Sequence, residues 1–289
     1  MNEDLINIIG SVAKVPSFSS YEERLQPFIR SFVAENGIKC TIDQHYNNLI
    51  IKYDNGSQPL MAFTAHLDKI DHFGNDIDEL PFKVENEQIV GQLDNAVGVG
   101  ICLYLLNNAR QLNLPGTLFL FSEMEESYGL RKNKKSLKNQ GAGLAPQIGA
   151  KRISEYLIKN ALIPSVIITI DTTPLFYGTP GIALYSRFWE KYLSNPSTEL
   201  LSKTSAIEDI IEEIDPGIIK ANNVNDYVMF GKTFNDFGYH IPSIALEPSI
   251  YPYHTIGERV FVSDLNALLD IIKRFVVMYS ENHETTVHS

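Results

Sequence analysis

Cysteine is scarce in this chain of 289 residues. Cys40 and Cys102 are the only two, and neither belongs to a CxxC pair, so the sequence predicts neither a disulfide framework nor a thiolate metal site. Cys102 falls within the apolar run GICLYLL, where a lone cysteine is usually a small core residue. The opening MNEDLINIIG lacks the basic stretch and long apolar segment of a signal peptide. We therefore expect a cytoplasmic protein.

Long apolar runs and an excess of positive charge are also missing. No run approaches the roughly 18 apolar residues that a membrane span requires, so no membrane association is expected. The formal net charge of −11 argues against general binding to nucleic acid, whose phosphates attract basic proteins. The sequence also has no GxSxG motif, which argues against a serine hydrolase of the common α/β type.

The sequence does contain short apolar strands that alternate with helices. Apolar residues at helical spacing predict helices at 3–14, 94–110, 146–160, 204–214 and 264–282. Ser20 and Glu23 form a possible capping box for one more helix, which would stop at Gly37. Runs rich in β-branched and aromatic residues predict strands at 38–43, 48–54, 59–66, 116–122, 164–171, 181–187 and within 240–248.

This alternation predicts an α/β fold of three layers, α/β/α, with helices on both faces of a mainly parallel, mixed central sheet. No internal repeat, low-complexity segment or linker rich in proline, glycine and serine interrupts the chain. We therefore expect residues 1–289 to form a single domain.

Imidazole and carboxylate side chains occur where the predicted strands end or where the following helix begins. Seven residues share this placement: His66, Asp68, Asp94, Glu125, Glu126, Asp171 and His254. Ligands of open α/β sheets gather at the carboxyl ends of the strands. We therefore expect five or six of these side chains to converge on one edge of one sheet.

Such a cluster is costly without a counter-charge, because like charges in a cleft repel one another and resist ionisation. A divalent cation removes this cost, and imidazole with carboxylate, without thiolate, suits zinc, cobalt or manganese. Asp68 lies two residues after His66, on the same side of an extended chain, and can hold the imidazole in one tautomer. Taken singly, the residues also have structural explanations, such as a helix N-cap for Asp94 or a hydrogen-bonded core histidine for His66.

Five short motifs occur in the order AHLD, LDNAVGVG, MEESYGL, IDT and YHT. In this order they resemble the co-catalytic zinc exopeptidases of peptidase clan MH, over about residues 60–260. That group contains leucyl-type and glutamyl-type aminopeptidases and a branch of carboxypeptidases and deacylases. The resemblance implies the zinc-exopeptidase (phosphorylase/hydrolase-like) fold and two divalent metal ions, with zinc favoured and cobalt or manganese as alternatives.

The resemblance also implies which residues bind the metals. His66 and Asp171 would bind one ion, Glu126 and His254 would bind the other, and Asp94 would bridge both. All five positions carry the residue type that the family's motifs require.

For the chemistry, the resemblance implies that Glu125 is the general base and that Asp68 orients the first metal-binding histidine. Glu125 would take a proton from a water shared by the two metals, and the resulting hydroxide would attack the scissile carbonyl. A tyrosine would polarise the oxyanion, and Tyr227, Tyr251 and Tyr253 are the candidates.

The glutamate motif departs from the aminopeptidase pattern. One residue commonly separates the glutamate pair from the following GL, whereas Ser127 and Tyr128 both intervene here. A shift of register would bring Glu123 into the pair. The spacing in FSEMEE favours Glu125 and Glu126, so these remain the predicted pair.

Spacing between the motifs bears on domain organisation. The 28 residues from His66 to Asp94 are too few for the inserted domain that builds tetrahedral particles. The 83 residues from Asp171 to His254 are few for the dimerisation domain of the carboxypeptidase branch. We therefore expect one catalytic domain without an inserted dimerisation or lid domain. Within the second interval, NDY at 225–227 resembles the SDH-type stretch of the aminopeptidases.

The sequence thus predicts a metal-dependent aminopeptidase that acts on peptides or small amino-acid-derived substrates. A metallo-carboxypeptidase or N-acyl amino-acid deacylase is the alternative, because LPFKVENEQIVGQLD at 80–94 is similar to that branch's loop. A non-catalytic binding protein on the same fold is a further alternative. The lysine-rich segment 131–138 reads either as a solvated loop or as a positive lid beside the site. Side-chain preference, native metal and oligomeric state are left open.

Overall fold

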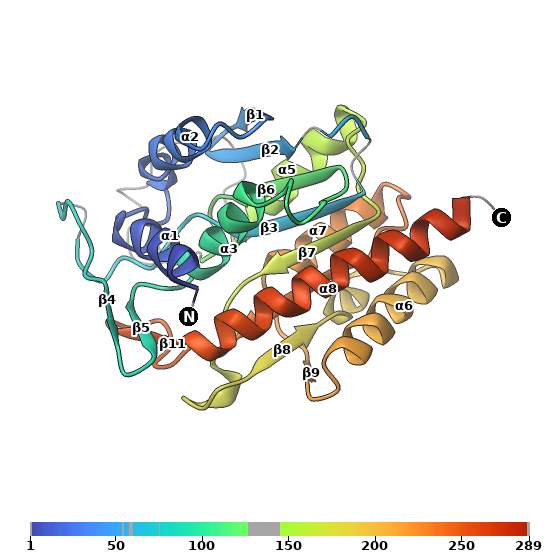
Figure 1. The fold of residues 1–289 in the computed structure, drawn as a ribbon. Coiled ribbons are helices and arrows are strands. Elements are labelled where there is room, and N and C mark those ends of the chain that lie inside the picture. The colour runs from blue at the N-terminus through green and yellow to red at the C-terminus, as the bar shows by residue number, and fades with distance from the viewer. Residues whose placement is uncertain (1, 54, 58–59, 75, 127–144, 288–289) are drawn as a thin grey trace.

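The computed structural model describes residues 2–53, 55–57, 60–74, 76–126 and 145–287 (Figure 1). The described helices are α1 Glu3–Lys14, α2 Gln26–Glu35, α3 Ala96–Asn107, α5 Ile148–Lys159, α6 Thr198–Ile214, α7 Asp226–Asp236 and α8 Val262–Val287. Short 3-10 turns lie at Glu22–Arg24, Pro174–Phe176 and Phe188–Tyr192. The strands are β1 Cys40–His45, β2 Asn48–Tyr53, β3 Met61–His66, β4 Lys83–Glu85, β5 Gln88–Gly91, β6 Thr117–Ser122, β7 Val166–Ile170, β8 Ile182–Tyr185, β9 Ile219–Ala221, β10 Ser243–Pro248 and β11 Glu258–Phe261.

Eight strands form the central sheet, in the order β1-β2-β6-β3-β7-β10-β8-β9. The middle of the sheet is parallel, since β3 pairs in parallel with β6 and β7, and β7 with β10. Antiparallel pairs of β2 with β1 and β6, and of β8 with β10, make the sheet mixed. Every residue of β3, β6 and β7 is buried, as expected for central parallel strands covered on both faces. The predicted fold class is confirmed.

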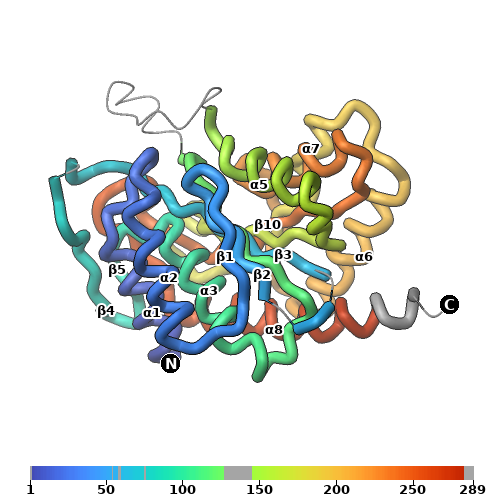
Figure 2. Tube along the Cα trace, turned by 90° about the horizontal axis from the view of Figure 1, so that it is seen from above, coloured from blue at the N-terminus to red at the C-terminus, as the bar shows by residue number. Residues whose placement is uncertain are grey.

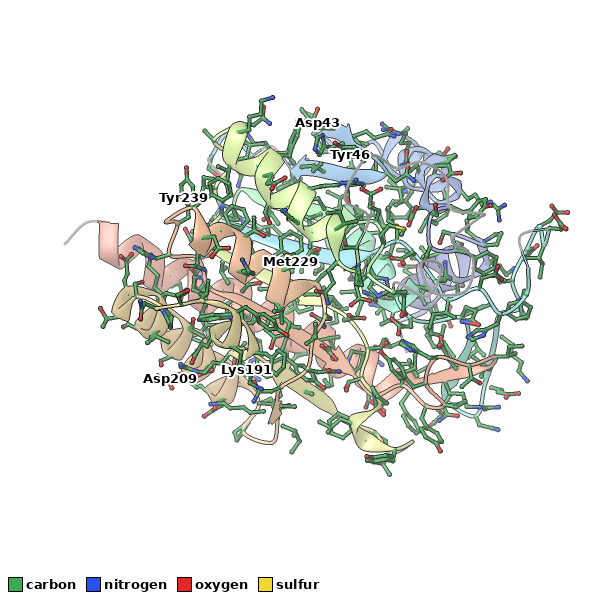
Figure 3. All side chains as sticks on the ribbon, turned by 180° about the vertical axis from the view of Figure 1, so that it is seen from behind. Asp43, Tyr46, Lys191, Asp209, Met229 and Tyr239 are labelled. Carbon is green, nitrogen blue, oxygen red and sulfur yellow. The ribbon has the colours of Figure 1, made fainter. Side chains whose placement is uncertain are left out.

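Helices cover both faces of this sheet (Figure 2). Alternate residues of β6 show how the layers form, because Phe119 and Phe121 join the larger apolar core while Leu118 and Leu120 join the smaller one. The larger core is completed by α1, α2, α3, α6 and α8, and the smaller by α5 and α7. Seen from behind, α5 and α7 lie across the sheet, with Met229 of α7 against the smaller core (Figure 3).

Several elements differ from the prediction. Helix α7 and strand β9 were not predicted, and the short strands β4, β5 and β11 form a separate three-stranded sheet in the order β11-β5-β4. Strands of three or four residues give too little alternation to be recognised from sequence. Helix α6 begins at Thr198 rather than residue 204.

The predicted capping box at Ser20 and Glu23 was wrong. Helix α2 begins at Gln26, after a 3-10 turn, and its N-cap Leu25 makes no side-chain hydrogen bond. Ser20 has a positive φ of 75°. The segment adopts this conformation because of a distant contact: the buried side chain of Glu22 accepts a hydrogen bond from the backbone N–H of Met124, just after β6.

None of the described helices is both long enough and apolar enough to cross a membrane. Helix α8 runs along one face of the sheet and packs its apolar residues into the larger core.

Candidate metal centre

The carboxyl ends of β3, β6 and β7 lie side by side and position most of the candidate site. In the parallel pair of β3 and β6, His66 is in register with Ser122. The chain then continues from β6 to Glu125 and Glu126, and from β7 directly to Asp171. Residues that are distant in sequence therefore reach one edge of the sheet because the strands are parallel.

Three buried residues form what we call the inner triad: His66, Asp94 and Asp171. Nε2 of His66 lies 3.2 Å from Oδ1 of Asp94 and 3.5 Å from Oδ1 of Asp171. One ligand atom from each residue falls within 4.8 Å of the other two, a spacing that a metal ion can bridge. Their side chains are 1%, 4% and 7% exposed, so the group is almost fully enclosed.

A second group, the outer triad, consists of Asp94, Glu126 and His254. Nε2 of His254 lies 3.2 Å from Oδ2 of Asp94 and 3.2 Å from Oε1 of Glu126. These ligand atoms also lie within 4.8 Å of one another. Asp94 therefore belongs to both triads, with one carboxylate oxygen toward each histidine.

The loop around Asp94 explains why its carboxylate is available. Asn95, not Asp94, is the N-cap of α3, and its side chain accepts a hydrogen bond of 2.7 Å from the N–H of Gly98. The backbone N–H of Leu93 and that of Asp94 donate to Oε2 of Glu258, at 2.7 and 3.1 Å. The explanation of Asp94 as a helix N-cap is thus wrong. The Glu258 carboxylate fixes the loop by accepting these two backbone N–H groups.

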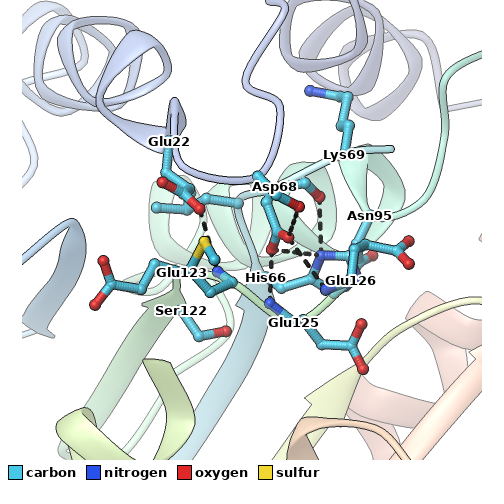
Figure 4. Close-up of polar contacts among 12 residues, drawn as sticks. Glu22, His66, Asp68, Lys69, Asn95, Ser122, Glu123, Glu125 and Glu126 are labelled. Atoms are coloured by element: carbon cyan, nitrogen blue, oxygen red, sulfur yellow. Dashed lines mark hydrogen bonds and ion pairs between the residues drawn. The ribbon is translucent and has the colours of Figure 1, made fainter. Parts of the chain in front are cut away.

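Asp68 supports the centre without being part of either triad (Figure 4). Nδ1 of His66 lies 3.0 Å from the backbone carbonyl of Asp68 and 3.4 Å from its Oδ1, which leaves Nε2 for the inner triad. The Asp68 carboxylate also accepts the backbone N–H groups of Glu125 and Glu126, at 2.9 and 3.1 Å. Oγ of Ser19 donates to it at 2.6 Å. Asp68 thus orients the histidine and the glutamate pair together.

Glu125 lies beside both triads. Together with His66 and Glu126 it forms a third group of ligand atoms within 4.8 Å. Burial raises the pKa of Glu125 well above its usual range, and the neighbouring Glu126 adds to this effect while His66 opposes it. A carboxyl with a raised pKa accepts and returns a proton more readily near neutral pH than an ordinary glutamate.

Without a cation, the centre holds more negative charge than its histidines balance. Burial and then repulsion by Asp94 raise the pKa of Glu126 to about 8. Burial disfavours the charged form of His254, but the carboxylates of Asp94 and Glu126 beside it outweigh this and raise its pKa to about 10. For His66 likewise, Asp171 and the surrounding carboxylates outweigh burial and raise the pKa. Protons thus stabilise the positions that divalent cations would stabilise in a loaded protein.

The donor set fits divalent metal ions. Each triad offers one imidazole nitrogen and two carboxylates, a combination typical of zinc, cobalt or manganese sites. Oε1 of Glu126 is buried and makes no hydrogen bond among the described residues, although it faces His254. Buried carboxylate oxygens of this kind are normally satisfied, and a metal ion would satisfy this one.

Glu247 and Asp226 are further buried carboxyls near the centre that were not among the predicted site residues. Leu246 of β10 is in register with Ile170 of β7, so the next residues, Glu247 and Asp171, are neighbours at the strand ends. Asp226, at the start of α7, is fully buried and hydrogen-bonded to Ser122 Oγ. The NDY motif pointed to Asp226, whereas only the pairing of β10 with β7 reveals the position of Glu247.

The open question about Glu123 is resolved by its contacts. Its side chain is fully buried and forms an ion pair of 2.8 Å with Arg152, away from both triads. Asn48 donates to the same carboxylate at 2.8 Å. The pair that faces the centre is therefore Glu125 and Glu126. Ser127, Tyr128 and the lysine-rich segment 131–138 lie outside the described residues.

The three tyrosine candidates differ in position. The ring of Tyr253 stacks on His254, with centroids 3.6 Å apart. Tyr227 is fully buried, and its hydroxyl accepts the backbone N–H of Phe188. Tyr251 is 48% exposed. Tyr253 is the candidate in direct contact with the outer triad.

Comparisons with known proteins give structural matches only. No family description matches the sequence, and no curated protein matches it. A TET aminopeptidase from a marine sediment archaeon of the Thaumarchaeota matches with a TM-score of 0.66 at 8% identity, covering 95% of this chain and 96% of that one. A Staphylococcus aureus tripeptidase matches with a TM-score of 0.62 at 15% identity, covering 95% and 97%. A Thermotoga maritima protein described as an endoglucanase matches with a TM-score of 0.58 at 12% identity, covering 93% and 96%. At these identities the similarity shows that the fold is shared across nearly the whole chain.

Proposed function

We propose that this chain is a co-catalytic metallopeptidase of clan MH and acts as an aminopeptidase. The observation that carries the proposal is the sharing of Asp94 by two triads, with Glu125 beside them. The five sequence motifs supply the residues of this arrangement in the order typical of that clan. The similar fold of the archaeal aminopeptidase and the bacterial tripeptidase supports the proposal.

His66 and Asp171 would hold one divalent ion, Glu126 and His254 the other, and Asp94 would bind both through its two oxygens. We propose zinc, with cobalt or manganese as substitutes, because the donors are imidazole and carboxylate. The bound ions would polarise the scissile carbonyl and lower the pKa of the attacking water. Asp68 fixes the imidazole of His66 and thereby its ligand nitrogen.

Glu125 is the proposed general base. A carboxylate oxygen of Glu125 lies within 4.8 Å of ligand atoms of His66 and Glu126. Neither triad includes Glu125, so its carboxylate is available to accept a proton. It takes a proton from the attacking water and returns it to the amine that leaves. A base of this kind contributes roughly 10²–10⁴-fold to the rate.

Charge favours the amino end of a peptide over its carboxyl end. Besides the triads, the buried Glu247 adjoins Asp171 and the buried Asp226 adjoins Ser122. Burial raises the pKa of Asp226 to about 7 and that of Glu247 well above its usual range, so in the metal-free protein both carboxyls hold protons more readily than ordinary ones. A free ammonium group would favour their charged forms and be attracted by them, whereas a free carboxylate would be repelled. An aminopeptidase is therefore preferred to a carboxypeptidase or a deacylase of N-acyl amino acids.

Glycoside hydrolysis, suggested by the endoglucanase description of one structure, fits the centre less well. Most glycosidases need two carboxyl groups, an acid and a base or nucleophile, and no histidine. Here two histidines each contact two carboxylates, which is an arrangement for cations.

The test is metal content followed by substrate choice. Protein purified without chelator, reloaded with Zn²⁺ and desalted should hold about two ions per chain by mass spectrometry, as two-metal hydrolases do. It should hydrolyse leucine p-nitroanilide but not N-acetyl-leucine. Hydrolysis of N-acetyl-leucine alone would favour the deacylase branch. Metal binding with neither activity, across a panel of aminoacyl anilides, would favour a binding protein on this fold.

A further inference from the structure

The turn that carries Glu125 and Glu126 is held by side chains rather than by regular secondary structure. Four consecutive backbone N–H groups, from Glu123 to Glu126, donate to side-chain oxygens. Asn48 accepts the first at 2.9 Å and Asp68 accepts the last two at 2.9 and 3.1 Å. Met124, between these anchors, has a positive φ of 61°.

Glu22 supplies the remaining acceptor. Its Oε1 accepts the N–H of Met124 at 3.2 Å, across 102 positions of the chain, and the N–H of Ser20 at 2.8 Å. Its Oε2 accepts Nδ2 of Asn47 at 3.1 Å. The side chain is fully buried, above the turn in Figure 4. Glu22 therefore joins three separate segments at the point where the left-handed residue reverses the chain.

This reversal separates the glutamates by role. Before it, Glu123 points to Arg152 and is anchored there. After it, Glu126 reaches His254 in the outer triad and Glu125 lies beside His66. A left-handed conformation is unfavourable for methionine, so it persists only where its surroundings fix it. Met124 itself makes two hydrogen bonds through its backbone: its carbonyl accepts the N–H of Gln147 at 2.9 Å, and its N–H donates to the Glu22 side chain.

We propose that Glu22 is a positioning residue of the centre: by accepting the Met124 N–H it sets the turn that aims Glu126 at the outer triad and Glu125 at the substrate. For Glu125 the inference rests on the proposed function, whereas for Glu126 it concerns metal binding alone. The role depends on the length of the Glu22 side chain, because its carboxylate oxygen must lie within hydrogen-bond distance of the Met124 N–H.

Two variants separate reach from charge. Glu22→Gln loses the charge but keeps an oxygen at the same distance for the N–H groups of Met124 and Ser20. Its amide nitrogen takes the place of Oε2, so the Asn47 side-chain amide must turn and present its oxygen. Glu22→Asp keeps the charge but is one methylene shorter and withdraws from Met124. Glu35→Gln is the control for the loss of a carboxylate, since this glutamate is exposed at the end of α2. If Glu22 acts by positioning the turn, Glu22→Gln should bind metal almost as the wild type does, and Glu22→Asp should bind it more weakly. If Glu22 acts through its charge, the order of the two variants should be reversed.

The primary readout is Co²⁺ alone, titrated into the metal-free full-length chain. The visible absorption of Co²⁺ depends on the number and type of its ligands, so it reports displacement of Glu126. We expect Glu22→Asp to weaken the second Co²⁺ by roughly 10–100-fold, as losses of supporting hydrogen bonds do, and to change its spectrum. Circular dichroism checks that each variant is folded. A folded Glu22→Asp with wild-type Co²⁺ affinity and spectrum, or a Glu22→Gln as impaired as Glu22→Asp, would overturn the proposal.

A second readout separates this inference from the proposed function. On leucine p-nitroanilide, with metal saturating, Glu22→Asp should lower kcat more than it raises KM, because the base is misplaced. If the wild type binds two Co²⁺ but hydrolyses no aminoacyl substrate, the proposed function fails while the Co²⁺ titration still decides the role of Glu22. If the wild type is active and Glu22→Asp matches it in both readouts, only the role of Glu22 fails.

Discussion

The inner and outer triads share Asp94 but are built in different ways. The inner residues His66 and Asp171 stand at the ends of central strands, and their side chains are at most 7% exposed. The outer residues Glu126 and His254 lie on loops, and the His254 side chain is 36% exposed. Sheet register fixes His66 and Asp171, whereas Glu126 depends on hydrogen bonds that the backbone N–H groups of the glutamate turn donate to Glu22 and Asp68. Similar donors can therefore be positioned by two distinct physical means.

The largest effect should come from the residue that both triads share. Asp94→Asn removes one anionic ligand from each triad, so we expect metal content to fall from about two ions per chain toward none. Activity should drop by more than the roughly 10–100-fold that the loss of a supporting contact costs. Mass spectrometry of the reloaded protein measures this. Asp209→Asn, at an exposed position of α6 (Figure 3), is the control and should behave as wild type. Loss of a single ion in Asp94→Asn would show that the aspartate serves one triad only.

Glu125→Gln should separate chemistry from metal binding. The amide cannot take a proton from water, so we expect kcat to fall roughly 10²–10⁴-fold while about two ions per chain remain. Steady-state kinetics and mass spectrometry of the same preparation test both parts. Wild-type turnover in this variant would exclude Glu125 as the base, and loss of one ion would show that it is a ligand.

The two histidines should differ in their effect on the stability of the metal-free protein. His66→Ala leaves the buried Asp94 and Asp171 without their cationic partner, which should reduce the free energy of unfolding by about 3–5 kcal/mol. His254→Ala removes a partner that is 36% exposed, but Asp94 and Glu126 are only 4% and 3% exposed. Its cost should therefore lie between the value of about 0–1 kcal/mol for an exposed ion pair and the larger cost of His66→Ala. Urea unfolding at pH 7 with chelator present compares them. Equal losses would contradict the structural contrast between the triads.

A smaller effect is expected from pH. Folding raises the pKa of His254 from 6.5 to about 10, so the folded metal-free chain holds this proton more tightly than the unfolded chain. The resulting stabilisation is fully present below pH 6.5 and is lost as the pH rises toward 10. We therefore expect the unfolding free energy of the chelated protein to decrease over that range, and less so in His254→Ala. A decrease of the same size in both proteins would show that the outer histidine is not its source.

Much of the inner triad was accessible from sequence because the signal is local. A buried strand is recognised by its apolar run, and the polar residue at its end is then evident, as for His66 and Asp171. The same logic found the glutamate pair after β6. Glu247 was not predicted because it is the last residue but one of β10 and does not follow the strand. Only the pairing of β10 with β7 shows that it lies beside Asp171. The separate sheet of β4, β5 and β11 escaped because its strands are too short to show a period.

The sequence by itself determined the layered α/β fold and the residues that gather at one sheet edge, because hydrophobic periodicity and strand-end polarity are properties of short segments. The tertiary structure decided how those residues divide into two groups around Asp94. It also decided that the segment containing Ser20 and Glu23 does not cap α2, and that Glu22 within it accepts the N–H of Met124 in the glutamate turn. These facts depend on contacts between segments about 100 positions apart, such as that between Glu22 and Met124. Local patterns carry no information about contacts of that kind, since only the packing of the whole chain creates them.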